Sequence, residues 1–193
     1  MKLDPFTDAL VRLVHCYYPP GLNNFDPGYK ESEESQRRTR LMQAHMQGSP
    51  SWRVFVWRVH QLFPDCSVWD TTVPLLDLCH GIRVSLPGFV PGAPRYDCVV
   101  ALLSQIAPVY ALYASHSDRS GPEVKGWVNL PPFPPEYQAH EAKLAELIES
   151  TFGFTRLSND TLLTPVPDLV PSSANFVLGE AQLIDCLFSR DRW

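Results

Sequence analysis

A run of uncharged residues from Cys98 to Ser117 is the feature that most restricts the fold of this 193-residue chain. Two segments that overlap this run, Tyr96–Leu103 and Val109–Ala114, are apolar at consecutive positions, and Gln105 and Pro108 stand between them. A helix that crosses a membrane needs about 20 predominantly apolar residues, and the polar break falls in the middle of this run. Strands that are apolar at consecutive positions are typically covered on both faces. We therefore predict two central strands of a sheet and no membrane span.

The wider segment from Cys66 to Ser117 predicts an antiparallel sheet. It consists of short runs rich in Val, Leu, Ile and Tyr that prolines and glycines interrupt, as is typical of strands joined by turns. A third strand is expected at Ile82–Leu86. The polar stretch from His116 to Gly126 and the proline-rich residues 131–135 are not expected to form a central strand, because proline cannot donate a hydrogen bond to a ladder.

Apolar residues at three- and four-residue spacing predict helices on both sides of this sheet in the sequence. The first helix covers residues 5–17, with Asp4 as its cap and Pro5 in its first position. A mostly solvated helix is expected from Glu31 to Met46, where acidic residues come first and basic residues follow. A later helix runs from Pro135 to Phe152 and is followed by a glycine that suits a helix C-terminus.

The segment Trp52–Phe63 is open to two interpretations. Ser51 is a suitable N-cap, and the apolar residues that follow it lie on one helical face. Alternation over Val54, Val56 and Arg58 instead favours a strand. We prefer the helix and keep the strand as the alternative.

The C-terminal part of the chain carries a short helical turn near Asn159–Leu163 and an amphipathic stretch from Gly179 to Phe188. The element order is therefore three helices, a sheet, a further helix and a tail. Because strands and helices are segregated along the chain, the sequence predicts an α+β fold. We expect a single domain over residues 1–193, in which the N-terminal helices and the later helix pack on an antiparallel central sheet.

Charge and cysteine content bear on the compartment and on the class of partner. The formal net charge is −5, which argues against a nucleic-acid-binding protein because phosphate contacts require an excess of basic residues. The acids Asp4 and Asp8, with Pro5, occupy positions where a secretory signal would begin its apolar run. The five cysteines are an odd number without regular spacing, which is typical of reduced thiols. We expect a cytoplasmic protein that binds neither nucleic acid nor membrane.

Residue patterns for catalysis or metal binding are scarce, and we expect no enzyme, no catalytic residue, no metal and no cofactor. The adjacent pairs His15-Cys16 and Cys79-His80 contain zinc-ligand residue types, but adjacent side chains point to different faces of an element. The acids Asp65, Asp70 and Asp77 are interpreted as solvated loop residues.

One further catalytic pattern is a nucleophilic pair between one of the cysteines and His60, His80 or His116. Apolar surroundings raise the pKa of a thiol and so disfavour the reactive thiolate. We therefore expect the cysteines to be structural.

Trp127 is the candidate partner-binding residue, because it follows a polar, glycine-flanked stretch in which an aromatic side chain can anchor a partner. Packing of this indole under its own loop is the alternative. Residues 1–100 hold ten basic and ten acidic residues, whereas residues 101–193 hold six and eleven, so the net charge comes from the second half. Asp118 and Glu123 are the acids nearest Trp127 and complete the candidate surface.

Four segments resemble a known family: residues His15–Leu22, Ile106–Tyr113, Val166–Asp168 and Leu178–Phe188 are similar to small cytoplasmic immunity proteins of bacterial polymorphic toxin systems. The resemblance covers most of the chain and rests on packing and turn motifs. It implies a non-catalytic α+β protein that binds one cognate toxin and blocks it. A basic toxin domain is the expected partner, because the second half of the chain is acidic.

Two other functions remain open from the sequence. An unrecognised small hydrolase would have a concave pocket with perturbed titratable groups, and a structural subunit of a larger assembly would have a large apolar surface patch.

Overall fold

The computed structural model describes residues 3–45, 48–73, 77–90, 92–121, 123, 125–171 and 176–188, and every structural statement below concerns this part of the chain. The helices are α1 (Pro5–Val14), α2 (Glu33–His45), α3 (Pro50–Leu62), α4 (Pro135–Phe152), α5 (Asn159–Leu162) and α6 (Leu183–Leu187). The strands are β1 (Val68–Asp70), β2 (Cys79–Ser85), β3 (Arg95–Ser104), β4 (Val109–Asp118), β5 (Lys125–Asn129) and β6 (Thr155–Arg156).

The six strands form one sheet, and the predicted α+β class is confirmed. The strand order is β1-β2-β3-β4-β5 with antiparallel neighbours, and β6 pairs with β4 in parallel. The turn between β3 and β4 falls at residues 105–108, where the polar break in the uncharged run predicted it. In β3, the residues from Cys98 to Ser104 are all buried, and in β4 those from Val109 to Ala114 are all buried. Both strands are central, as the sequence predicts.

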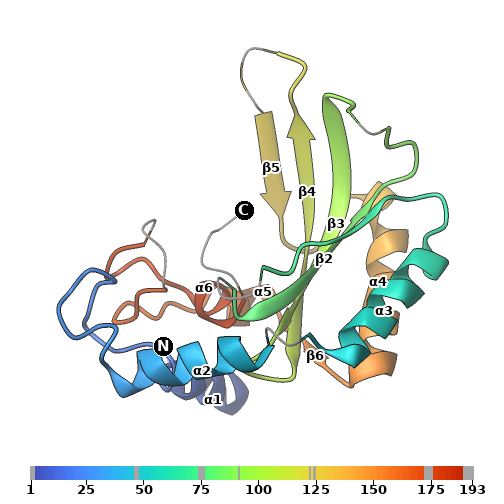
Figure 1. Cartoon of the computed structure of the whole chain (residues 1–193). Helices are drawn as coiled ribbons and strands as arrows, with labels where there is room; N and C mark the ends of the chain where they lie inside the picture. Colours follow the sequence, from blue (N-terminus) through green and yellow to red (C-terminus); the bar gives the residue numbers. More distant parts are fainter. Residues whose placement is uncertain are drawn as a thin grey trace.

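Helices cover the two faces of this sheet (Figure 1). On one face, residues of α1, α5 and α6 pack with β3 and β4 in a core cluster that includes Leu10, Leu162, Leu183, Val100 and Ala111. On the other face, α3 and α4 pack with the alternate residues of the same strands in a second cluster that includes Phe55, Val59, Leu144, Val99 and Leu112. The strands therefore separate two hydrophobic cores.

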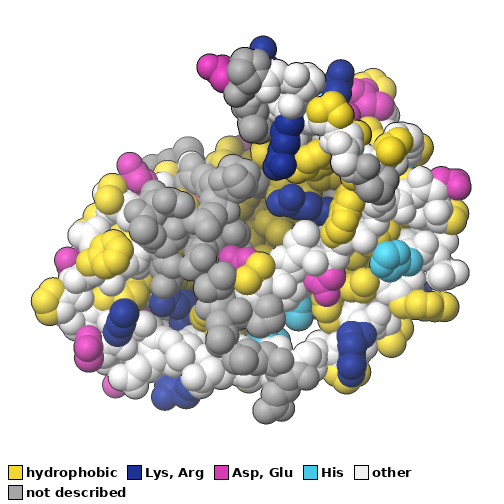
Figure 2. Space-filling model, turned by 45° about the horizontal axis from the view of Figure 1, so that its top comes forward, with side chains coloured by type: hydrophobic (Ala, Val, Ile, Leu, Met, Phe, Trp, Pro, Cys, Tyr) yellow, Lys and Arg dark blue, Asp and Glu magenta, His cyan; other side chains and the backbone are white. Residues whose placement is uncertain are grey.

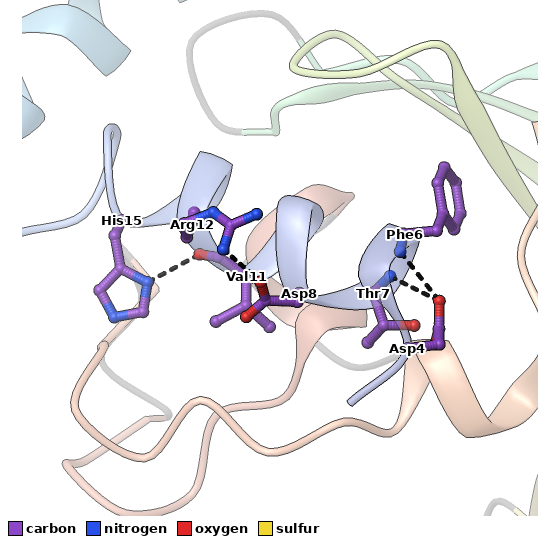
Figure 3. A network of polar contacts seen from close by, with 7 residues as sticks. All are labelled: Asp4, Phe6, Thr7, Asp8, Val11, Arg12 and His15. Carbon is purple, nitrogen blue, oxygen red and sulfur yellow. Dashed lines mark hydrogen bonds and ion pairs between the residues drawn. The ribbon is translucent and has the colours of Figure 1, made fainter. Parts of the chain in front are cut away.

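Helix α1 is fixed at both ends by polar contacts (Figure 3). The Asp4 carboxylate accepts hydrogen bonds from the backbone N–H groups of Phe6 and Thr7, at 3.0 and 3.1 Å, as expected for an N-cap. At the other end, His15 Nδ1 lies 2.7 Å from the Val11 carbonyl oxygen, and its Nε2 lies 2.9 Å from the Asp168 carboxylate. The helix ends at Val14, earlier than the predicted residue 17.

Helix α2 is mostly exposed, as predicted, and begins at Glu33. Met46, the predicted end of this helix, lies outside the described residues. The buried Arg38 attaches the helix to the body of the protein, because its guanidinium lies over the rings of Tyr18 and Tyr29 and donates a 3.0 Å hydrogen bond to the Tyr29 hydroxyl. This contact combines cation–π attraction with a polar bond.

Helix α3 is a helix and not the alternative strand, but its predicted cap is wrong. The N-cap is Ser49, whose side chain accepts a hydrogen bond from the Trp52 N–H, and Pro50 takes the first helical position. Ser51 lies inside the helix, and its hydroxyl contacts that of Ser49 at 2.6 Å. Proline fits the first turn because its missing N–H has no helical partner there, and this moves the start of the helix toward the N-terminus.

The expectation that the polar stretch from His116 to Gly126 stays outside the central strands is wrong for His116–Asp118, which belong to β4. Strand β4 continues to Asp118 because Ser115–Asp118 pair with both neighbours, β3 and β5. Strand β2 likewise begins at Cys79 instead of Ile82. Polar side chains are tolerated at these positions because an antiparallel sheet can expose part of one face to water.

The two-sided core makes a direct stability prediction. Phe55 of α3 is 0% exposed, and Phe25, in the loop before α2, is 84% exposed. We expect Phe55→Ala to lower the free energy of unfolding by about 3–5 kcal/mol, because it removes buried surface and leaves a cavity. The matched Phe25→Ala variant should change it by less than about 0.5 kcal/mol. Urea unfolding of both variants measures the difference, and equal values would contradict the assigned core.

Candidate functional site

The three sequence-predicted site residues all lie on the hairpin formed by β4 and β5. Asp118 is the last residue of β4, Trp127 is the third residue of β5, and Glu123 lies in the connection between the two strands. The ends of β3, β4 and β5 at this hairpin project beyond the helices (Figure 1). The structure therefore brings the three residues onto one projecting part of the sheet, and their role in partner binding remains a prediction.

Trp127 lies on a strand at the end of the strand order, whereas the sequence placed it on a loop. Its indole stacks on the imidazole of His116, with ring centroids 5.4 Å apart and planes inclined by 15°, and meets the ring of Tyr137 edge-on at 5.8 Å. The residue is nevertheless 38% exposed. Its ring is thus supported on one side by two aromatic side chains and still presents surface to solvent.

A polar network fixes the two rings that support this indole. Tyr137 donates a 2.6 Å hydrogen bond from its hydroxyl to Asp97 Oδ1, and His116 Nδ1 donates a 2.7 Å bond to the same oxygen. The register of the sheet places Asp97 opposite His116 and His116 opposite Trp127, so the three residues form a row across β3, β4 and β5. The network holds the aromatic cluster in one arrangement.

The hydrogen bonds also set the protonation state of Asp97. Partial burial tends to raise the pKa of this carboxyl group, but the hydrogen bonds from Tyr137 and His116 outweigh burial and hold the pKa below its ordinary value. The pKa of the Tyr137 phenol changes in the opposite direction, because burial and the hydrogen bond to Asp97 raise it well above the usual range. Asp97 is therefore a carboxylate acceptor at neutral pH.

Charges of both signs surround the tip of the hairpin. Asp118 is partly exposed and accepts hydrogen bonds from the hydroxyl and the backbone N–H of Ser120, and these bonds lower its pKa. The register pairs Asp118 with Arg95 on β3 and with Lys125 on β5. Asp118, one of the two acids predicted to face a partner, therefore stands between two basic residues, and the tip does not carry acidic residues alone.

Sequence reasoning missed the one Cys–His contact that the structure contains among the described residues. Cys66 Sγ lies 3.3 Å from His140 Nε2, and the rings of His140 and Phe63 stack at 5.1 Å. Burial raises the pKa of the Cys66 thiol and lowers the pKa of His140. Both shifts oppose the thiolate–imidazolium form that a nucleophilic pair needs.

The zinc-ligand residue types considered in the sequence do not come together. The described residues contain no group of three or more His, Cys, Asp and Glu side chains that could hold a metal ion. Cys16 is exposed and Cys79 is buried, and all five cysteines are free thiols. The neighbouring His15 is engaged with Asp168.

A cavity of about 360 Å³ lies between α3, β2 and the turn after β3. His80 lines it and stacks on Trp52 with ring centroids 4.6 Å apart. Burial lowers the pKa of His80 to about 4, so the imidazole is neutral near pH 7. Loss of hydration and the nearby His45 both favour the uncharged form of this imidazole, which packs on the ring of Trp52.

Comparisons with protein-family models, with curated proteins and with solved structures find no match to this chain. In the described part of the chain, no helix combines the length and the apolar character that crossing a membrane requires. The observations define an α+β protein with a two-sided core and a projecting hairpin that presents a supported, half-exposed tryptophan.

The low pKa of Asp97 predicts how stability changes with pH. A carboxyl group whose pKa is lower in the folded state than in the unfolded state stabilises the fold at pH values above its unfolded pKa of about 3.9. This contribution is lost as the pH falls through the pKa of the folded state. Asp97→Asn should therefore be less stable than the wild type at pH 7, and the difference should shrink below about pH 4. Urea unfolding at several pH values measures this difference in the free energy of unfolding, and Glu31→Gln, at an exposed position, is the control. A difference that is constant from pH 7 to pH 3 would contradict the network.

Proposed function

We propose that this chain is an immunity protein that binds a cognate bacterial toxin in the cytoplasm and neutralises it by occlusion, without catalysis. The observation that carries the proposal is Trp127: an exposed indole at the edge of the sheet, supported by two further aromatic rings. The resemblance of four segments of the sequence to immunity proteins points in the same direction. The partner is a toxin protein, and it is neither nucleic acid nor membrane.

The physical basis is the energetics of protein interfaces. A few residues carry most of the binding energy of an interface, and they are enriched in Trp, Tyr and Arg. An aromatic side chain that is already held in place loses little conformational entropy on binding. Stacking on His116 and the fixed position of Tyr137 supply this pre-organisation for Trp127.

Charge contributes to the rate of association more than to the final affinity. The net charge of −5 favours encounter with a basic toxin, and Asp118 and Glu123 are acids of the hairpin that carries Trp127. Because Arg95 and Lys125 flank Asp118, the two acids also give the tip an alternating charge pattern that discriminates between partners.

Co-expression tests the proposal directly. The polypeptide encoded by the gene that directly neighbours the gene for this chain is expressed in a bacterial host, with and without this chain, and growth is measured. We expect growth arrest without the chain, rescue with it, and a stoichiometric complex on size exclusion. Arrest that the chain does not relieve, or relief without a complex, would contradict occlusion.

Binding kinetics of the toxin complex test the role of the hairpin. Trp127→Ala should raise the dissociation rate constant by about 30-fold, as expected for loss of about 2 kcal/mol at a central aromatic residue. Trp57→Ala is the matched control, because Trp57 on α3 is 62% exposed and lies away from the hairpin. Equal effects of the two variants would show that Trp127 is not the anchor.

The acids of the hairpin are tested in the same assay. Reversal of Asp118 and Glu123 to lysine should slow association at low ionic strength by more than reversal of Glu31 and Glu34 does. If both reversals slow association equally, the acids of the hairpin have no special role in binding the toxin.

The co-expression assay and the binding assay together separate occlusion from catalysis. An unrecognised hydrolase remains the alternative function, and Asp97 with His116 is the pair in the structure that would serve it as an oriented base. Under occlusion, an Asp97→Asn variant that still binds the toxin also still protects the host. Loss of protection with unchanged binding would instead favour the hydrolase.

A further inference from the structure

A groove of about 370 Å³ opens on the sheet beside the edge strand β1, between β2 and the start of β3. Three aromatic side chains form its walls. Trp69 and Phe89 meet edge-on with ring centroids 5.2 Å apart, and Phe89 and Tyr96 meet edge-on at 6.3 Å. Trp69 is 37% exposed, so the groove is open to solvent. Figure 2 shows that this side of the molecule is hollowed and that Lys or Arg side chains lie in the hollow among hydrophobic ones.

Arg83 lies between these walls. It occupies the middle of β2, where the register places it opposite Trp69 on β1 and opposite Val100 on β3. Its guanidinium interacts with the hydroxyl of Tyr113, and this contact and its charge partly offset the burial that raises the pKa of Tyr113. The Nε atom of Arg83 is buried and has no hydrogen-bond partner in the structure.

Among the described residues, no carboxylate forms an ion pair with Arg83. The cations of the ion pairs in this part of the chain are Arg12, Arg156, His15 and His116. Asp70 also lines the groove, but its carboxylate accepts hydrogen bonds from Trp52 Nε1 at 2.9 Å and from the Thr72 N–H at 2.9 Å. Asp70 is paired with Ile82 in the ladder, one position from Arg83, so the two side chains point to opposite faces of the sheet.

Removing part of the hydration of a cation costs free energy when no counter-charge is near, so an anion that contacts the cation stabilises it. The planar guanidinium matches the two oxygens of a carboxylate and forms strong charge-assisted hydrogen bonds with it. The aromatic walls shield part of such a bond from water and so strengthen it. The groove therefore has the chemistry of a carboxylate site.

We propose that this groove binds a carboxylate side chain of the toxin, an Asp or Glu that pairs with Arg83 between Trp69 and Tyr96. This inference rests on the proposed function and extends it, because it names a second anchor and the complementary group on the partner. A groove of about 370 Å³ accommodates one or two side chains. The walls also combine the residue types Trp, Tyr and Arg that dominate binding energy at interfaces.

The chemistry of the groove is tested on the isolated protein with benzoate, a carboxylate attached to an aromatic ring. We expect benzoate to shift the Arg83 Nε–H resonance and to quench Trp69 fluorescence. Benzamide, which is uncharged and of the same shape, should do neither. Arg83→Met keeps an apolar stem and removes the charge, and it should raise the Kd for benzoate about tenfold or more. The control is Arg53→Met, because Arg53 is exposed on α3 and does not line the groove.

Two results of this titration would overturn the proposal. Equal binding of benzamide and benzoate would show an apolar groove without a carboxylate site. Absence of any shift of the Arg83 Nε–H resonance at saturating benzoate, or equal quenching of Trp69 fluorescence in Arg83→Met, would show that the guanidinium does not bind an anion.

The toxin complex tests the identity of the occupant. Arg83→Met should raise the Kd for the toxin about tenfold or more, and charge removal at one Asp or Glu of the toxin should produce no further loss in the Arg83→Met background. A complex whose Kd is unchanged by Arg83→Met contradicts the groove as an interface and leaves the proposed function standing. If the wild type forms no complex, the proposed function fails, and this inference fails with it even where benzoate binds.

Discussion

The burial of β3 and β4 on both faces is the constraint on which the rest of this structure depends. Residues that alternate along these strands belong to two different hydrophobic clusters, so each face requires its own covering layer. The N-terminal α1 and the C-terminal α5 and α6 supply one layer, although they lie more than a hundred residues apart in sequence. Helices α3 and α4 supply the other. Neither layer is dispensable, because an uncovered face would expose a continuous apolar surface.

The same strands carry the candidate surfaces where they extend past the helices. Cross-strand register brings Asp97, His116 and Trp127 into one row on one face of the sheet, and it sets Arg83 beside Trp69 near the edge. Because side chains alternate between faces, a slip of one residue would separate both groups. The buried positions of β3 and β4 fix the register, and the core thereby positions the residues proposed to bind a partner.

The central strands and the long helices could be predicted from the sequence because their signals are local. Consecutive apolar residues marked β3 and β4, and the spacing of apolar residues marked α1, α3 and α4. Trp127 could be singled out by its polar neighbours, but its place on a strand could not be predicted, because β5 is short and contains glycine. Its support by His116 and Tyr137 depends on strand pairing and on the docking of α4.

The N-terminus of α3 contains two competing local signals for its cap. Ser49 and Ser51 are both suitable residue types, and only the proline between them distinguishes the two positions. Arg83 could not be recognised as a site residue, because a single arginine in an apolar strand carries no pattern. Its aromatic neighbours come from β1, from the loop after β2 and from β3.

We propose that a partner protein covers the hairpin and the groove together. Fluorine NMR of the protein labelled with 5-fluorotryptophan, free and bound to the toxin encoded by the neighbouring gene, tests this proposal most directly. We expect the signals of Trp127 and Trp69 to shift on binding, while the signal of Trp57, which is more exposed than either, stays in place. A shift of Trp57 with Trp127 and Trp69 unchanged would contradict it.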